Sequence, residues 1–264
     1  MIVHGQTTPT DYFIFNEVNS ADYGVFISQT GTFVTPDHDV STMSVPGRSG
    51  SILFDNNRFN NVDIVVPCFI PRDFKTKFDN FRAIMMADSQ YHRLEFTSEP
   101  EYYRMAYVTG PINPTTGPAN KSGRFDVVFH CLPQKFLKIG ERTLDIAVSG
   151  TVLHNRTMLN AKPLLGVAGT GSIRFRGAGI TEPRQIFDVT INRTTETSWI
   201  YLDCETGNAY YERVTSDGFR QKVAVNNWVQ TALSGFPQIR PGANFVYLSG
   251  DITRVQVKPN WWTL

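Results

Sequence analysis

The chain has 264 residues, of which 41% are apolar and 19% charged, and its formal net charge is +1. This balance predicts one large or two ordinary folded domains, and it argues against extensive disorder and against a basic nucleic-acid-binding surface. The start of the chain lacks the basic and apolar regions of a signal peptide, and no run reaches the roughly 18 apolar residues of a membrane helix. We therefore expect a soluble protein made and used on the cytoplasmic side, unless a carrier particle releases it.

The first 44 residues alternate turns with short β-forming runs, at 12–15, 24–28 and from 38 to 45. A turn follows in which Pro46 fixes one backbone angle and glycines on either side loosen the chain. Arg48 and Ser49 therefore lie exposed on a bend between two strands. The next apolar run, 62–66, is β-branched and typical of a buried strand.

Residues 73–88 predict the one helix, with Asp73 as its N-cap. Its apolar side chains recur at spacings of four, three and four and form one stripe, Phe74, Phe78, Phe81 and Met85. Such a stripe indicates packing against a sheet rather than contact with a cofactor. A lone helix among strands predicts an α+β architecture for this part of the chain.

Strands are predicted at 91–96 and 102–108, followed by a polar excursion over 110–123. Residues 124–131 alternate apolar and polar side chains more regularly than any other segment. We expect Leu132 and Pro133 to end that strand, and residues 134–140 to connect two domains. The domain boundary is placed between residues 138 and 139.

The second half is predicted to be all β, because many short strands and turns follow one another at regular spacing, which favours a β-sandwich. Its expected strands are 144–148, 163–168, 172–175, 185–191, 199–203, 208–212, 245–249 and 252–257.

Residues that could do chemistry are scattered. The five histidines occur singly, so no zinc site is indicated, and Ser49 lacks the spacing of a nucleophile elbow. Asp203 and Glu205 could face the same side of a strand as a glycosidase pair, but Glu205 borders a turn, where solvated acids are common. The three cysteines lie far apart in strand-like runs and are expected to be buried and reduced. We expect no enzyme, no cofactor and no metal.

Aromatic residues are concentrated in the second half. Trp199 and Tyr201 share one face of a strand, which would suit either a carbohydrate platform or burial against a neighbour. Trp261 and Trp262 are expected to pin the last strand, and they are candidates for a subunit interface because tryptophan is enriched there.

Several short motifs, in order along nearly the whole chain, resemble one family. They are Pro46–Gly50, Asp55 to Ile64, Arg93–Phe96, Pro100–Ala106, Gly123–Pro133, Asn155, Pro163, Gly169–Gly171, Leu202–Glu205, Phe236–Pro237, Pro241–Asn244, Ser249–Gly250 and Pro259–Trp262. The chain is similar to the distal tail (Dit) proteins of long-tailed bacteriophages.

This resemblance implies a tail-tube-like N-terminal domain, 1–138, of split-barrel or sandwich type, and a galectin-like β-sandwich, 139–264. It implies a structural protein of the virion tail tip, made in the host cytoplasm. Six copies would close one ring, or two stacked rings, around a channel through which DNA passes without specific binding. The ring would join the tail tube protein to a tail-associated baseplate hub protein and to a receptor-binding protein, with no membrane involved.

Ring closure requires one patch to meet a different patch on the next copy. The candidate interface residues are Arg48, Ser49, Arg58, Asn113, Thr115, Trp261 and Trp262. Two other functions stay open: a carbohydrate-binding, receptor-recognition module using Trp199 and Tyr201, and a glycosidase using Asp203 and Glu205.

Overall fold

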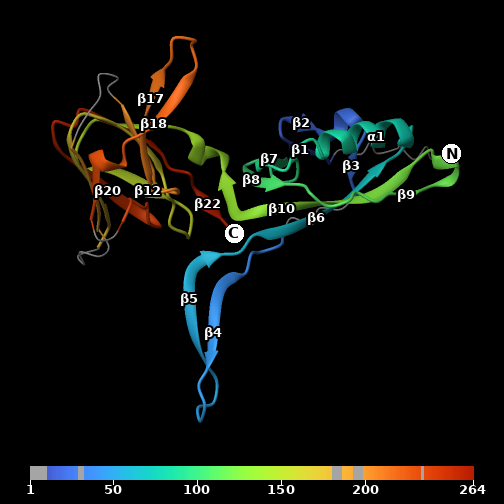
Figure 1. Cartoon of the computed structure of the whole chain (residues 1–264), viewed down its shortest axis with the longest axis horizontal. Coiled ribbons are helices and arrows are strands. Elements are labelled where there is room, and N and C mark those ends of the chain that lie inside the picture. The colour runs from blue at the N-terminus through green and yellow to red at the C-terminus, as the bar shows by residue number, and fades with distance from the viewer. Residues whose placement is uncertain (1–10, 29–32, 180–185, 193–198, 233–234) are drawn as a thin grey trace, which may run out of the picture. The chain divides into compact units, whose positions relative to one another are not determined.

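A computed structural model of the chain describes residues 11–28, 33–179, 186–192, 199–232 and 235–264 (Figure 1). Over these residues the chain is mostly β, with a single α-helix, and this part of the predicted fold class is confirmed. The chain divides into two compact units, Met1–Lys135 with Leu264, and Phe136–Thr263. No helix among the described residues has the length and apolarity needed to cross a membrane.

The first unit is built on a sheet whose strands run in the order β2-β1-β7-β8-β10-β6-β3, with β9 added beside β10. Every second residue of β6 is buried, and β10 alternates in the same way over its first ten residues. The register places Phe129 opposite Ile64, so both strands present one face to the core. The alternation predicted for 124–131 is therefore confirmed. The strands of this sheet are β1 (Phe13–Phe15), β2 (Val18–Asn19), β3 (Phe26–Ile27), β6 (Val62–Ile70), β7 (His92–Phe96), β8 (Tyr102–Tyr107), β9 (Thr115–Thr116) and β10 (Gly123–Leu137).

Helix α1 (Phe74–Met85) lies against the core with the predicted stripe. All four stripe residues are buried, and the rings of Phe78 and Phe81 meet Phe125 of β10 at centroid distances of 5.0 Å and 5.6 Å. Aromatic contacts at these distances stabilise a core beyond the area that they bury. The stripe is therefore structural, as its spacing indicates.

The start of this helix differs from the prediction, and its end comes three residues early. Asp73 occupies the N-cap position, but its backbone is left-handed (φ +56°) and its side chain makes no capping hydrogen bond. Its carbonyl accepts from the backbone N–H of Lys77 at 3.2 Å, and its carboxylate lies 3.8 Å from the Lys77 ammonium. A side-chain cap normally needs an extended backbone at this position, and Asp73 does not have one.

Strand β10 does not stop at Pro133, so the predicted strand end is wrong, while the division between the two units, after Lys135, falls within the predicted connection over 134–140. The strand continues to Leu137. The pairing of β10 with β6 ends where Cys131 is opposite Val62. Pro133 lies beyond this point, so pairing with β6 does not require the backbone N–H that proline lacks. The Pro133 carbonyl instead accepts a hydrogen bond from Arg104 Nη1 at 3.4 Å.

The second unit is a sandwich of two antiparallel sheets, ordered β11-β21-β13-β16-β17-β18 and β12-β20-β14-β15-β19. Inward side chains of both sheets form one hydrophobic core, in which Leu165 and Leu202 of the first sheet join Phe175 and Val246 of the second. A shared core between two facing sheets is the predicted sandwich arrangement.

The strands of the second unit are β11 (Leu144–Ile146), β12 (Thr151–Asn155), β13 (Leu164–Ala168), β14 (Gly171–Gly177), β15 (Ile186–Ile191), β16 (Ile200–Asp203), β17 (Asn208–Val214), β18 (Arg220–Ala224), β19 (Val229–Thr231), β20 (Gly242–Gly250), β21 (Arg254–Lys258) and β22 (Trp262–Thr263).

Candidate assembly surface

Two strands of the first unit stand apart from its sheet. Strands β4 (His38–Ser44) and β5 (Ser51–Phe59) pair with each other, and within the described residues they form a sheet of their own (Figure 1). Most of their residues are exposed, so this hairpin buries little against the rest of its unit. A two-stranded hairpin without a packed face is marginally stable in water.

Large apolar side chains lie on both faces of this hairpin. The register pairs Met43 with Ile52 and Ser41 with Phe54 on one face, and Thr42 with Leu53 on the other. The exposed fractions are 50% for Met43, 50% for Phe54, 62% for Leu53 and 42% for Val40. Exposed apolar groups gathered on one element mark an interaction surface. Because they occupy both faces, the hairpin is suited to lie between two covering surfaces.

The register of the hairpin is irregular near its base. His38 pairs with Phe59 and Val40 with Asp55, so β5 has two extra residues between these pairs. Asp39 bridges this irregularity, since its carboxylate accepts from Arg58 Nε at 2.5 Å and from Asn56 Nδ2 at 3.1 Å. These side-chain hydrogen bonds hold the pKa of Asp39 below its usual value, and the bond from Arg58 has the largest effect.

Arg58 therefore has a partner inside its own hairpin, which the sequence did not indicate. Its side chain is nevertheless exposed. The ion pair and the hydrogen bond from Asn56 tie the two strands together where the ladder is interrupted, and bulges of this kind bend a hairpin. Arg58 is best understood as a residue that orients the hairpin.

Arg48 and Ser49 lie at the tip of the hairpin, as the turn residues predict. Gly47 and Gly50 have φ values of +81° and +83°, which non-glycine residues rarely adopt, and the backbone N–H of Arg48 donates to the Val45 carbonyl at 3.2 Å. Both candidate side chains are exposed. The tip thus presents one cation on a well-defined turn.

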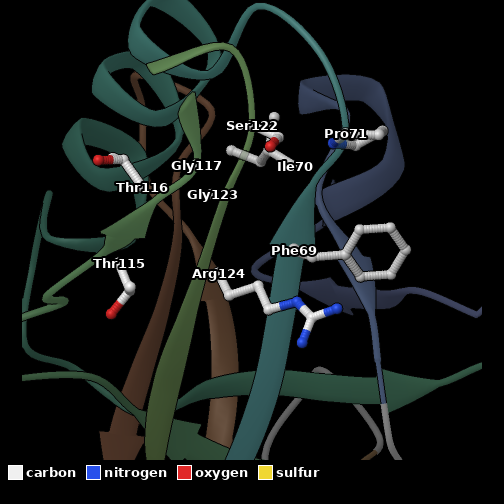
Figure 2. A pocket seen from close by; sticks show the side chains of 9 residues that line it. All are labelled: Phe69, Ile70, Pro71, Thr115, Thr116, Gly117, Ser122, Gly123 and Arg124. Atoms are coloured by element: carbon white, nitrogen blue, oxygen red, sulfur yellow. The ribbon is translucent and has the colours of Figure 1, made fainter. Parts of the chain in front are cut away.

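Asn113 and Thr115 lie at the other end of β6 from the hairpin. Strand β9 pairs with β10, so that Thr115 is opposite Arg124, and Arg124 is opposite Phe69 of β6. Thr115, Arg124 and Phe69 border an open hollow of about 580 Å³, shown in Figure 2, and Asn113 is not among the residues that line it. Arg124 extends its guanidinium toward the side of β6 that carries Phe69 (Figure 2). The excursion over 110–123 also contains a 3-10 turn, Pro118–Asn120.

The lining of this hollow does not suit acid–base chemistry. Its nine residues include one charged side chain, Arg124, together with hydroxyl groups, glycines and apolar groups. General acid–base catalysis depends on side chains such as histidine or carboxylates in reach of a substrate, and this lining contains neither.

Asp203 and Glu205 do not form the carboxylate pair that a glycosidase would need. Asp203 ends β16, and its carboxylate accepts the backbone N–H groups of Glu205 at 3.0 Å and Thr206 at 3.3 Å. Glu205 lies in the turn, 3.4 Å from the ammonium of Lys162. The strand spacing considered for the pair does not apply, because the strand ends at Asp203 and Glu205 lies in the turn that its neighbours predict. Both carboxylates serve the turn.

The residues that could bind a metal ion or react through a thiol are not grouped into a site in the described part of the chain. No cluster of three or more histidine, cysteine or acidic side chains occurs there that could hold a metal ion. The three cysteines are buried and free, as predicted. Burial raises the pKa of the Cys131 thiol to about 12 and raises those of Cys68 and Cys204 as well, which makes the reactive thiolate scarce.

The terminal tryptophans are engaged inside the second unit. Trp261 packs against its hydrophobic core, and the Trp261 carbonyl accepts the backbone N–H of Leu137 at 2.8 Å. Trp262 donates from Nε1 to the carbonyl of Asn160 at 2.8 Å. These contacts hold the chain end in place, as expected, and both indoles are half-buried.

Trp199 and Tyr201 lie on one side of β16, half-buried, while Ile200 and Leu202 are buried on the other side, as predicted. The Tyr201 ring stacks on Tyr210 of β17 at a centroid distance of 5.4 Å. Burial, together with the negative charge of Glu212, raises the pKa of Tyr201.

No protein-family model and no curated protein matches the chain. Among solved structures it is similar to the SPP1 Dit (gp 19.1) protein, which is described as a paradigm of the hub adsorption apparatus in phages that infect Gram-positive bacteria. The TM-score is 0.67 at 13% sequence identity, over 94% of this chain and 98% of that chain. The chain has the Dit fold. A structure of the phage p2 baseplate in its activated conformation with Sr matches with a TM-score of 0.49 and 9% identity, over 94% of this chain and 97% of that chain.

The resemblance inferred from scattered motifs is therefore confirmed as a likeness of fold. What sequence reasoning missed is the exposure of the hairpin. Its signal was present in the adjacent apolar pair Leu53 and Phe54, because neighbouring strand residues point to opposite faces and cannot both face one core.

Proposed function

We propose that this protein is a distal tail subunit of a long-tailed phage, and that six copies of its first unit close into a ring. The ring surrounds a channel for DNA and joins the tail tube above to the baseplate hub and adhesion proteins below. The fold likeness to a phage hub protein supports this proposal over nearly the whole chain. The observation that carries it is the β4–β5 hairpin, which has exposed apolar groups on both faces.

A cyclic ring needs a heterologous contact, in which one surface of a copy meets a different surface of the next. The hairpin supplies the protruding half of such a contact, with Leu53 and Phe54 on its two faces and Arg48 and Ser49 at its tip. Asp39 and Arg58 set its direction. A stable interface buries about 1,200–2,000 Å² in total, and a hairpin covered on both faces can contribute much of that area.

The excursion over 110–123 is the second proposed contact, with Thr115 lining the hollow at the far end of β6 and Asn113 two residues before it. Because the hairpin and this excursion lie at opposite ends of one strand, they can touch two different neighbours. We assign the excursion to the tail tube or to an adjacent copy. Trp261 and Trp262 are left out of the proposed interface, since their contacts serve their own unit.

The ring is tested by native mass spectrometry and negative-stain microscopy of the purified protein over a concentration series. A double variant, Leu53→Ser with Phe54→Ser, removes one apolar group from each face of the hairpin. Phe219→Ser is the matched control, because Phe219 is 73% exposed in the second unit. We expect hexameric rings from the wild type and the control, and monomers of unchanged Tm from the double variant.

Two results would contradict this function. One is a wild type that stays monomeric at every concentration and forms no ring when co-produced with its tail proteins. The other is a hairpin variant that assembles as well as the control. Shortening the 110–123 excursion tests the second contact separately. Rings that form but no longer join tail tubes are expected, and normal tails would remove the role of this segment.

A further inference from the structure

An aromatic row crosses the outer face of the first sheet of the second unit. The strand registers align Gly166 of β13 with Tyr201 of β16, and Tyr201 with Tyr210 of β17. Trp199 directly precedes β16, and its ring lies on the same side of the sheet as that of Tyr201, since a Cβ atom on Gly166 would contact both rings. The inward neighbours Ile200 and Leu202 fill the core. The three rings are therefore not needed for that core, and each of them is half-buried.

Gly166 creates the space in which these rings lie. A Cβ atom at this position would come within 3.3 Å of Trp199 Cε3 and 3.4 Å of Tyr201 Cε1. The contact with Trp199 is slightly tighter than side chains normally make, so an alanine would shift the indole by a few tenths of an ångström and a larger side chain would displace the rings further. The indole and the phenol thus rest close to the sheet backbone, and both border one shallow strip.

The tyrosines are ordered by stacking rather than by hydrogen bonds. Tyr201 and Tyr210 stack at 5.4 Å with an interplanar angle of 23°, and the Lys222 ammonium lies 4.4 Å from the centre of the Tyr210 ring. Neither hydroxyl group hydrogen-bonds to a described residue. A tyrosine hydroxyl that is half-buried and has no protein partner is available to a ligand.

Polar side chains of both signs border the row. Gln256 of β21 is opposite Gly166, while Glu212 pairs with Arg220 at 3.3 Å and Asp145 with Arg254 at 2.8 Å. These two arginines are matched by carboxylates, and Lys222, over the Tyr210 ring, is opposite Glu212, so the face has an excess of about one positive charge, which is little for a phosphate. It does offer amide, carboxylate and hydroxyl groups around an aromatic centre.

We propose that this face binds a neutral saccharide. A pyranose ring has one side of C–H groups and a rim of hydroxyl groups, and it matches aromatic rings bordered by donors and acceptors. Strand addition is not possible here, since β13 and β16 have partners on both sides. A protein hot spot would call for fully desolvated side chains, whereas these three rings are half-buried. The site lies within one unit of one copy, so it does not depend on ring formation.

The test is a glycan array of neutral and anionic oligosaccharides, probed with the labelled full-length protein. We expect the wild type to bind one or more neutral saccharides, and Trp199→Ala to lower the signal at least tenfold. Tyr201→Phe, which removes only the hydroxyl group, should lower it several-fold, and Gly166→Ala should also weaken binding. Tyr247→Ala is the control, because Tyr247 is an exposed tyrosine of the other sheet.

Tryptophan fluorescence provides a second readout. Titration with the oligosaccharide that binds best on the array should change the emission of the wild type and of Tyr247→Ala, but not that of Trp199→Ala. Circular dichroism establishes that each variant is folded, and Tyr201→Phe keeps the test decisive if Trp199→Ala unfolds. The proposal is overturned if no saccharide binds, if only anionic ones bind, if Tyr201→Phe binds like the wild type, or if the aromatic variants instead lose a protein partner.

Discussion

Asp39 on β4 and Arg58 on β5 form an ion pair, with 2.5 Å between Oδ2 and Nε, across the irregular part of the β4–β5 register. The pair joins the strands where the regular ladder is interrupted. It also lies between the base of the hairpin and its apolar distal part. We therefore expect the Asp39 carboxylate to help set the direction of the β4–β5 hairpin, which we propose as an assembly surface.

The stabilising effect of Asp39 should depend on pH. Its folded-state pKa is lowered, chiefly by the hydrogen bond from Arg58, so its contribution is fully present above the unfolded value of 3.8. The contribution is lost as the pH falls through the folded value. We expect Asp39→Asn to have a lower Tm than the wild type at pH 7, and the difference to shrink below pH 4. Thermal unfolding at both pH values checks this, and a difference that grows in acid would contradict it.

Phe129 should be essential for the first unit. It is fully buried, and its ring meets Phe13 at 5.1 Å and Phe15 at 5.3 Å. Replacing a buried phenylalanine with alanine costs about 3–5 kcal/mol. We expect Phe129→Ala to lower the free energy of unfolding by that amount in urea, whereas the exposed Phe219→Ala should change it by less than about 0.5 kcal/mol. Similar costs for the two variants would show that the core is assigned wrongly.

Arg104 is a buried cation, and we expect that its positive charge is not needed for stability. It is 4% exposed, burial lowers its pKa, and it donates to the carbonyl of Pro133. Replacing a buried charge with an apolar side chain of similar volume is often neutral. We expect Arg104→Met to stay within about 1 kcal/mol of the wild type and Arg104→Ala to lose about 2–4 kcal/mol through a cavity. Equal losses in urea unfolding would instead give the guanidinium a structural role.

The cysteines should be unreactive in the folded protein. Burial raises the pKa of all three thiols, that of Cys131 to about 12, so thiolate is scarce at pH 8. We expect reaction with Ellman's reagent to be slow under native conditions and rapid in denaturant, where all three thiols of the chain should react. A thiol that reacts quickly in the native state would show that its strand opens locally.

Local pattern alone determined much of this fold. The alternation over 124–131 and the four-residue stripe of α1 both appear in the structure as predicted, because each element buries one face and so repeats its apolar residues at its own period. The exposed turn at Arg48 was predictable for a similar reason, since glycine and proline restrict the backbone locally.

Tertiary structure decided what depends on neighbours distant in sequence. Pro133 does not end β10 because the register with β6 has already ended at Cys131, and Glu205 is no partner for Asp203 because β16 ends at Asp203, two residues before Glu205. The row of Gly166, Tyr201 and Tyr210 exists only through the registers of three strands. The alternation of residues in the sequence shows which side chains share a face of their own strand. Which residues lie beside them is set by pairing and packing, and these are properties of the folded chain.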